Sequence, residues 1–400
     1  MASRNKVRLL FGARQTGKTS LLRHAARGEG WVHYNLQDSA LRLAWEANPS
    51  VFTREVRALP RSIRCVVVDE IQKAPALLDE VQALHDEAPH RFQFYLTGSS
   101  ARKLRARSAN LLPGRSHLFR IHPLVRGEVR GVVESWSPPV RGRPIRAGTA
   151  SIHSFPPWTI EDELLFGSLP GIRLESRDSR RKTLAAYVET YLEEEIRHEG
   201  LVREMGPFTN FLRLAAIESG RTVNLAKLSQ ESGVAISTLK NFLGVLVDTF
   251  VGTLLPPYRR SARRRLLTTP RFYFFDLGVR NAAARLPLEP GILGTEGGAM
   301  LEHWVGLELL RRADYAGPGH SVSSWRTADG AEVDFVWESP GEDLPIEVKW
   351  TANPSERDAR HLRTFLELHP TRARRGLLIC RCRAPMELGR HILAVPWDRW

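Results

Sequence analysis

A glycine-rich loop, set between a short apolar run and the start of a helix, most restricts how this chain can fold. Residues 7–11 are mostly β-formers, and residues 12–19 fit the phosphate-loop pattern G-x-x-x-x-G-K-S/T at every fixed position. In that order a strand leads into a loop whose backbone N–H groups can face a phosphate, and the following helix adds its positive N-terminal end. The sequence therefore predicts an α/β fold with a parallel sheet and a nucleotide site.

Each fixed position of the loop has a chemical reason. Gly12 and Gly17 let the backbone approach phosphate oxygens because no Cβ intervenes. Lys18 is expected to reach the β- and γ-phosphates, and the Thr19 hydroxyl is expected to ligate Mg²⁺. The residues expected to hold ATP are Gly12, Ala13, Arg14, Gln15, Thr16, Gly17, Lys18, Thr19 and Ser20.

An apolar run that ends in two carboxylates predicts the other half of such a site. Residues 65–68 have the character of a strand buried on both faces, and Asp69 and Glu70 follow at its carboxyl end, where ligands bind in parallel sheets. Asp69 is expected to hold Mg²⁺, and Glu70 to polarise the attacking water. The alternative, a strand that simply ends in surface acids, is disfavoured by the preceding phosphate loop.

A third strand is expected over residues 92–96, and small polar residues follow it. Thr97 or Ser99 would sense the γ-phosphate or position water, whereas a serine here would also cap a helix from Ala101; both interpretations stay open. Arg115 is the candidate arginine finger. Because such a finger acts on a neighbouring subunit, this role would require a homo-oligomer.

The middle of the chain predicts a linker and then helices. Residues 134–160 are interrupted by Pro and Gly and are expected to be a linker, and residues 161–206 a helical connector. Over residues 207–280 a helix capped by Asn224, a turn at Gly233 and a longer helix form a helix-turn-helix pattern. The alternative is a purely structural winged helix. The arginines expected to contact the nucleic-acid backbone are Arg259, Arg260, Arg263, Arg264 and Arg265.

The charge balance points the same way. The 58 basic residues exceed the 44 acidic ones and give a net charge of +14, which favours a polyanionic partner such as DNA. Arginine-rich codon usage is the alternative, because only eight of the basic residues are lysines. No apolar run is long enough to span a membrane, no secretory signal is present, and three cysteines make no disulfide scaffold. We therefore expect a cytoplasmic protein without membrane contact.

The C-terminal part carries a second constellation. Asp334 on one predicted strand (residues 332–337) and Glu347-x-Lys349 on the next form the nuclease pattern D…E-x-K. Asp334 and Glu347 would share a divalent metal, and Lys349 would orient the nucleophilic water. Glu302, on a helix expected over residues 301–313, would add a carboxylate. The alternative is an inactive remnant of such a site.

These motifs resemble those of a family of bacterial and archaeal AAA-type ATPases. The segments that carry the resemblance are residues 12–19, 66–72, 96–100 and 113–115. In that family a winged-helix segment and a restriction-endonuclease-like, PD-(D/E)XK-type domain of unknown function follow the ATPase domain. The resemblance thus implies an ATPase domain over residues 1–133, a winged-helix segment over 207–280 and an endonuclease-like domain over 281–400. Leu169–Gly171 also resembles a turn of that family before a long helix, and apolar residues at helical spacing predict that helix over residues 178–199.

Two functions follow from this arrangement. The first is an ATPase that binds and hydrolyses Mg-ATP, associates with DNA and carries a metal-dependent nuclease. The second is a nucleotide-gated binding or regulatory module whose nuclease-like domain is inactive. Glu70 favours the first, because a module that only binds nucleotide needs no residue to polarise water.

Overall fold

The computed structural model describes residues 6–25, 30–100, 112–130, 155–192, 205–258 and 269–400. The chain divides into two compact units. Unit 1 comprises Met1–Pro123 and Val245–Val251, and unit 2 comprises Leu124–Gly244 and Gly252–Trp400.

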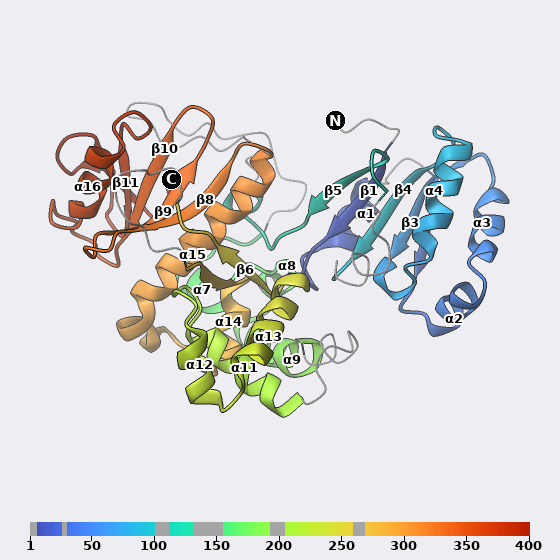
Figure 1. Ribbon diagram of the computed structural model, residues 1–400, viewed down its shortest axis with the longest axis horizontal. Coiled ribbons are helices and arrows are strands. Elements are labelled where there is room, and N and C mark those ends of the chain that lie inside the picture. Colours follow the sequence, from blue (N-terminus) through green and yellow to red (C-terminus); the bar gives the residue numbers. More distant parts are fainter. Residues whose placement is uncertain (1–5, 26–29, 101–111, 131–154, 193–204, 259–268) are drawn as a thin grey trace. The chain divides into compact units, whose positions relative to one another are not determined.

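Unit 1 is built on a five-stranded sheet with the order β2-β3-β4-β1-β5 (Figure 1). The strands are β1 (Val7–Phe11), β2 (Gly30–Asn35), β3 (Ile63–Asp69), β4 (Gln93–Gly98) and β5 (Ser116–Arg120). Every pairing between them is parallel. All five carboxyl ends therefore meet at one edge of the sheet, which confirms the expected α/β fold with a phosphate loop after its first strand.

The helices of unit 1 are amphipathic and bury their apolar sides in the core of this sheet. They are α1 (Lys18–Ala25), α2 (Ser39–Ala47), α3 (Ser50–Arg57) and α4 (Leu77–Glu87), with a 3₁₀ turn over Ile71–Lys73. Val66 and Val68 of β3 are fully buried in one cluster with Trp45 and Phe52 of the helices. Burying each such side chain stabilises the fold by about 1.5–3 kcal/mol, so the strand that ends in Asp69 is firmly fixed.

Unit 2 begins with helices. They are α6 (Arg126–Arg130), α7 (Ile160–Phe166), α8 (Pro170–Leu174), α9 (Arg177–Ala186), the π-type segment Tyr187–Leu192, α11 (Met205–Ile217), α12 (Leu225–Ser232), α13 (Ile236–Asp248), whose end from Val245 is assigned to unit 1, and α14 (Leu277–Ala283). Between α13 and α14 lie the antiparallel strands β6 (Gly252–Leu255) and β7 (Arg271–Phe274). The start and end expected for α12 are confirmed: Asn224 Oδ1 accepts from the N–H of Lys227 at 3.0 Å, and Gly233 has a φ of 70°.

Three boundaries differ from expectation. Leu169–Gly171 was expected to be a turn, but Pro170 starts the short helix α8, because proline suits the first position of a helix. The helix expected over residues 178–199 is regular only to Ala186, where π-type geometry begins. The helix expected from residue 301 is α15 (Leu293–Ala316), whose first turns hold three glycines that obscure its pattern.

The C-terminal part of unit 2 is a six-stranded mixed sheet with the order β12-β13-β11-β10-β9-β8. Its strands are β8 (Ser321–Arg326), β9 (Glu332–Glu338), β10 (Asp343–Val348), β11 (Gly376–Cys380), β12 (Met386–Glu387) and β13 (Ile392–Pro396). The helices α15 and α16 (Arg360–Leu368) both pack on β9 and β10. The two strands expected to carry the D…E-x-K residues are therefore antiparallel neighbours in the sheet.

Candidate functional site

The phosphate-loop residues curl over the carboxyl end of β1. Gln15 and Gly17 have φ values of 61° and 89°, in the left-handed region that turns the chain back toward α1. A Cβ on Gly12 would lie 2.1 Å from the carbonyl oxygen of Ile121, so only glycine fits beside β5. The buried Lys18 Nζ donates to the carbonyl oxygens of Gly12 at 2.9 Å and Ala13 at 2.8 Å, which holds its ammonium over the loop.

Asp69 links the loop to two other strands. Its Oδ2 accepts from the Thr19 hydroxyl at 3.0 Å, and its Oδ1 accepts from the Thr97 hydroxyl at the end of β4. His33 of β2 brings its Nε2 to 3.6 Å from Oδ2. Burial alone would raise the pKa of Asp69, but the contacts with His33, Thr97 and Thr19 outweigh it and lower the pKa to about 2. Asp69 is therefore a carboxylate at neutral pH.

Glu70 is held by a separate pair of polar side chains. Its backbone is left-handed, with a φ of 61°, and the residue is 6% exposed. Its Oε2 accepts from the Ser99 hydroxyl at 2.9 Å and from the Gln72 amide, which also donates to Ser99 Oγ at 2.9 Å. Thr97 at the end of β4 therefore contacts Asp69, and Ser99 just after the strand contacts Glu70. The helix that Ser99 was alternatively expected to cap lies outside the described residues.

Arg115 directly precedes β5, where the amino ends of the strands lie. Its carbonyl oxygen accepts from the N–H of Val7, at the amino end of β1, whereas the phosphate loop follows the carboxyl end. Its side chain is partly exposed and pairs with Asp86, with Nε 2.6 Å from Oδ1. The described residues of this chain do not bring Arg115 to its own phosphate loop, so the finger role stays a prediction about a neighbouring subunit.

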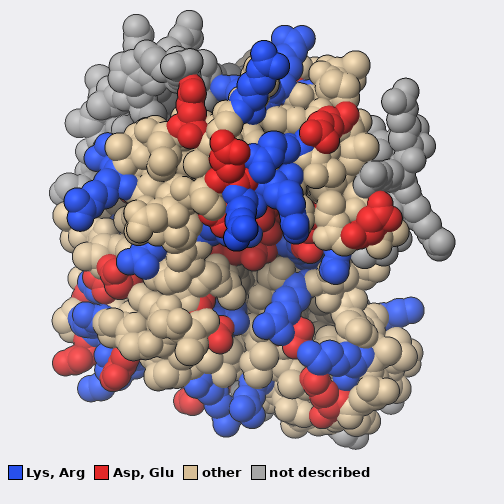
Figure 2. Space-filling model, turned by 90° about the vertical axis from the view of Figure 1, so that its left-hand side faces the viewer, with Lys and Arg blue, Asp and Glu red and all other residues tan. Residues whose placement is uncertain are grey.

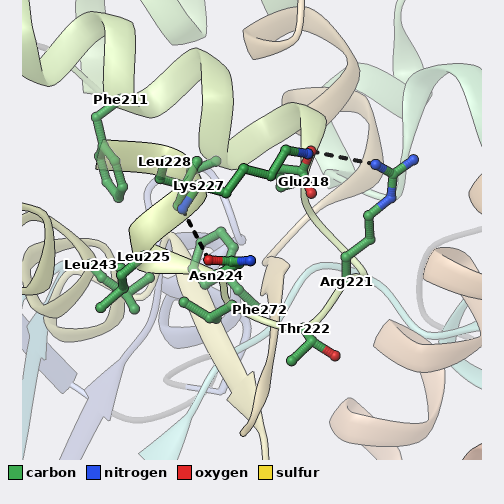
Figure 3. Close-up of a pocket in the computed structure, with 12 residues that line it drawn as sticks. Phe211, Glu218, Arg221, Thr222, Asn224, Leu225, Lys227, Leu228, Leu243 and Phe272 are labelled. Atoms are coloured by element: carbon green, nitrogen blue, oxygen red, sulfur yellow. Dashed lines mark hydrogen bonds and ion pairs between the residues drawn. The ribbon is translucent and has the colours of Figure 1, made fainter. Parts of the chain in front are cut away.

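The five arginines expected to contact nucleic acid, Arg259 to Arg265, lie outside the described residues. Near them in sequence, an apolar pocket opens between α11, α12 and β7 (Figure 3). Its two lining cations, Lys227 and Arg221, lie 2.7 and 3.4 Å from the same Glu218 carboxylate oxygen. Because Glu218 already offsets their charge, this pocket is a poor candidate for a phosphate site.

In the C-terminal sheet, Asp334 of β9 and Glu347 of β10 lie side by side. Phe335 pairs with Ile346 in these antiparallel strands, so the register places Asp334 opposite Glu347 at the next position. Lys349 follows the end of β10 and donates to Glu347 Oε1 at 2.6 Å, and the N–H of Val348 donates to Asp334 Oδ2 at 2.9 Å. The three predicted residues thus form one polar group, to which Glu302 of α15 belongs electrostatically.

The acid groups in this cluster are shifted toward their protonated forms. Burial is the largest cause, and the Asp334 charge adds to it, so that the pKa of Glu302 and of Glu347 is raised to about 8 for each. Burial also raises the pKa of Asp334, against the opposing effect of Arg271 and Lys349. Close carboxylates of this kind require a proton or a cation between them.

Sequence reasoning missed two members of the cluster. Arg271 of β7 donates from Nη1 to Glu302 Oε1 at 2.9 Å and from Nη2 to Glu332. Glu332 carried a signal, because it precedes Asp334 by two residues on the same strand and alternation places both on one face. Arg271 carried none, since its partners are 31 and 61 residues away in the chain. At the nucleotide site His33 and Gln72 were missed for the same reason.

Whether a divalent cation fits this cluster depends on which carboxylate oxygens are not already engaged in hydrogen bonds. Among the described residues no three His, Cys, Asp or Glu side chains are grouped so that they alone would hold a metal. Mg²⁺, however, is commonly bound through one or two carboxylates with water or substrate completing its shell. Glu347 is 4% exposed and its Oε2 has no hydrogen-bond partner among the described residues, so this oxygen suits a cation. Figure 2, which looks onto the left-hand side of Figure 1, shows acidic side chains in a recess with Lys and Arg side chains around it.

Comparison with known proteins agrees with the fold. Residues 4–130 match the family model described as "AAA domain". Residues 158–289 and 297–400 match two models described as domains of unknown function, DUF8612 and DUF4143. The N-terminal part is therefore an AAA-type, ATPase-like module, which implies nucleotide binding, and the C-terminal part is a domain whose function is not defined by its family.

Two relatives span most of the chain. They are the uncharacterized proteins Mb2031c of Mycobacterium bovis and Rv2008c of Mycobacterium tuberculosis, each 24% identical over 361 residues, which is 88% of this chain and 72% of the relative. Neither name assigns an activity. None of the helices in the described part of the chain is long and apolar enough to cross a membrane.

The hydroxyl of Thr97 gives the first testable prediction. Thr97→Val keeps the shape of the side chain but removes one hydrogen bond to Asp69, which we expect to lower the stability of unit 1 by about 1–3 kcal/mol and weaken Mg-ATP binding several-fold. Thermal unfolding and calorimetric titration with Mg-ATP measure the two effects. Thr249→Val is the control, because that buried hydroxyl donates to carbonyl oxygens of its own helix. Equal losses in both variants would contradict the assignment.

The raised pKa values predict how unit 2 responds to pH. Between pH 4.5 and about 8 the folded chain keeps protons on Glu302 and Glu347 that the unfolded chain releases, so stability should fall as pH rises through this window. Glu302→Gln removes one of these groups and should reduce the fall by about 1–2 kcal/mol. Thermal unfolding at pH 5 and pH 8 with a chelator measures this. Glu356→Gln, at an exposed carboxylate, should leave the difference unchanged.

Proposed function

We propose that this chain binds and hydrolyses Mg-ATP at the carboxyl edge of the unit 1 sheet. The observation that carries the proposal is the Asp69 carboxylate, which accepts hydrogen bonds from Thr19 of α1 and Thr97 of β4. Through its two oxygens, this one ionised carboxylate joins the start of α1, next to the phosphate loop, to the end of β4. Thr19 and Asp69 would hold Mg²⁺, which when bound offsets the charge of the phosphates.

The remaining groups fit hydrolysis better than binding alone. Lys18 lies over the loop, where its ammonium would contact the β- and γ-phosphates. Glu70 is a second carboxylate at the same strand end, and Ser99 and Gln72 fix its position. A carboxylate so fixed accepts a proton from, or orients, an attacking water. A module that only senses nucleotide has no use for this second acid.

We further propose that the ATPase works with DNA. The net charge of +14 and the five arginines at residues 259–265 support this part, since backbone contacts by arginine need no particular base sequence. The alternative is the nucleotide-gated binding or regulatory module, in which bound nucleotide controls a partner and the nuclease-like domain is inactive. DNA dependence of the ATPase rate separates the two.

The test is ATP turnover of the full chain with and without duplex or single-stranded DNA. Lys18→Ala should abolish nucleotide binding, because it removes the cation at the phosphates. Glu70→Gln should still bind ATP but hydrolyse it at least about a hundredfold more slowly, as expected for loss of a general base. Unchanged turnover in both variants would refute the ATPase. If neither duplex nor single-stranded DNA stimulates turnover of the unaltered chain, the result favours the regulatory module.

A second candidate function lies in the C-terminal sheet, where the open Glu347 Oε2 favours it. We propose that Asp334 and Glu347 hold a divalent metal, which when bound would activate water toward a phosphodiester. Lys349, at 2.6 Å from Glu347, fixes that carboxylate and places a compact positive charge beside the site. An inactive remnant would keep the cluster without cleaving.

Metal binding and cleavage are measured separately for this candidate. Asp334→Asn and Glu347→Gln should each weaken Mn²⁺ binding at least about tenfold in calorimetric titration and abolish any Mg²⁺-dependent cleavage of DNA or RNA. Glu338→Gln, on the same strand as Asp334, is the control. Binding without cleavage in the unaltered chain would leave the inactive remnant, and no binding would refute the metal site.

A further inference from the structure

Arg271 lies at the centre of the carboxylate cluster but comes from another part of the chain. It starts β7, and its side chain is 7% exposed. One guanidinium nitrogen contacts Glu302 Oε1 at 2.9 Å, and the other contacts Glu332. A planar guanidinium presents these two donors in a fixed fork, which a lysine could not reproduce. Arg271 therefore joins α15 to β9 by a two-sided ion pair.

The charges of the cluster do not cancel within the protein. Four carboxylates, those of Glu302, Glu332, Asp334 and Glu347, face the cations Arg271 and Lys349, and the half-exposed Arg326 contacts Glu332 where water screens its charge. When all are ionised, two negative charges remain uncompensated. One divalent cation carries the two positive charges that would balance them. The alternative is that two protons bind, and the raised pKa values of Glu302 and Glu347 reflect this tendency to take up protons.

We propose that Arg271 is the resident counter-ion that matches this site to a divalent cation and so determines its ion specificity. Arg271 neutralises the outer acids, Glu302 and Glu332, and leaves Asp334 and the unpartnered Glu347 Oε2 for the ion. This inference rests on the metal site proposed above and adds the residue that sets its charge. Without Arg271 the site would carry three uncompensated charges and would favour a trivalent ion.

The position of Arg271 in the chain has a consequence for the domain architecture. It lies within residues 158–289, which match one family model, whereas the four acids lie within residues 297–400, which match another. The site therefore needs residues from both segments. This agrees with their place in a single compact unit, and a fragment of residues 297–400 alone would lack the counter-ion.

Other charged groups near the cluster differ from Arg271 in position. Arg326 of β8 lies 3.5 Å from Glu332, but its side chain is 49% exposed, so water screens its charge. His361 of α16 contacts the backbone carbonyl of Glu332 at 3.0 Å. Tyr273 of β7 is buried beside the acids, and burial raises the pKa of its hydroxyl so that it stays neutral. Arg326 is thus the matched control for Arg271.

The experiment is calorimetric titration of the full chain with Ca²⁺ and with Tb³⁺ at one fixed pH. The ratio of the two affinities cancels effects of positioning that both ions share. Arg271→Met should shift this ratio toward Tb³⁺ by at least about tenfold, because one extra unit of site charge acts more strongly on the ion of higher charge. Arg271→Lys should restore the ratio, and Arg326→Met should leave it unchanged.

The opposite change provides a second measurement that does not depend on the folding of Arg271→Met. Glu332→Gln removes one negative charge and should shift the ratio toward Ca²⁺ by a similar factor. An unchanged ratio in Arg271→Met and Glu332→Gln, with both ions bound by the unaltered chain, would overturn the role of Arg271. If the unaltered chain binds neither ion, the metal site itself fails and the inference falls with it.

Discussion

The register between β1, β4 and β3 is the constraint on which the nucleotide site depends. Thr97 pairs with Leu10 across one side of β4, and Leu96 pairs with Val68 across the other. The phosphate loop, the Thr97 hydroxyl and Asp69 therefore reach the same edge of the sheet within one residue of each other. A slip of one residue would turn Thr97 to the opposite face of β4, so the apolar packing that fixes the register also fixes the site.

Much of this site could be predicted from the sequence, because its chemistry is local. The phosphate loop and the Asp69-Glu70 pair each occupy a short stretch whose spacing alone specifies the strand end, the turn and the helix start. The same holds for α12, where Asn224 and Gly233 mark both ends. Pro170 failed as a signal because proline is compatible with both a turn and the first turn of a helix, and only tertiary packing decides between them.

The partners of these residues could not be predicted, because they are set by contacts between distant segments. Gln72 is close to Glu70 in sequence, yet its role depends on Ser99, 27 residues further along. Arg271 had the least signal of all, since the sequence displays a richer run of arginines just before it. Because of that run, the predicted contacts of arginine with a charged partner were assigned to residues 259–265. The buried Arg271 instead contacts Glu302 of α15 and Glu332 of β9.

The surroundings of the carboxyl groups shift their pKa values in opposite directions at the two acidic sites. Burial would raise the pKa of Asp69, but His33 and the hydroxyls of Thr97 and Thr19 stabilise its charge, so its pKa lies at about 2 and the group is already ionised at neutral pH. Burial, and then the charge of Asp334, raise the pKa of Glu302 and of Glu347 to about 8 each, despite the nearby Lys349. A cation would therefore meet the two sites differently: Asp69 presents a charge already formed, whereas the C-terminal cluster would have to exchange protons for the ion. Ion binding in unit 2 should consequently release protons and strengthen as pH rises, whereas the carboxylate in unit 1 offers the same charge across the neutral range.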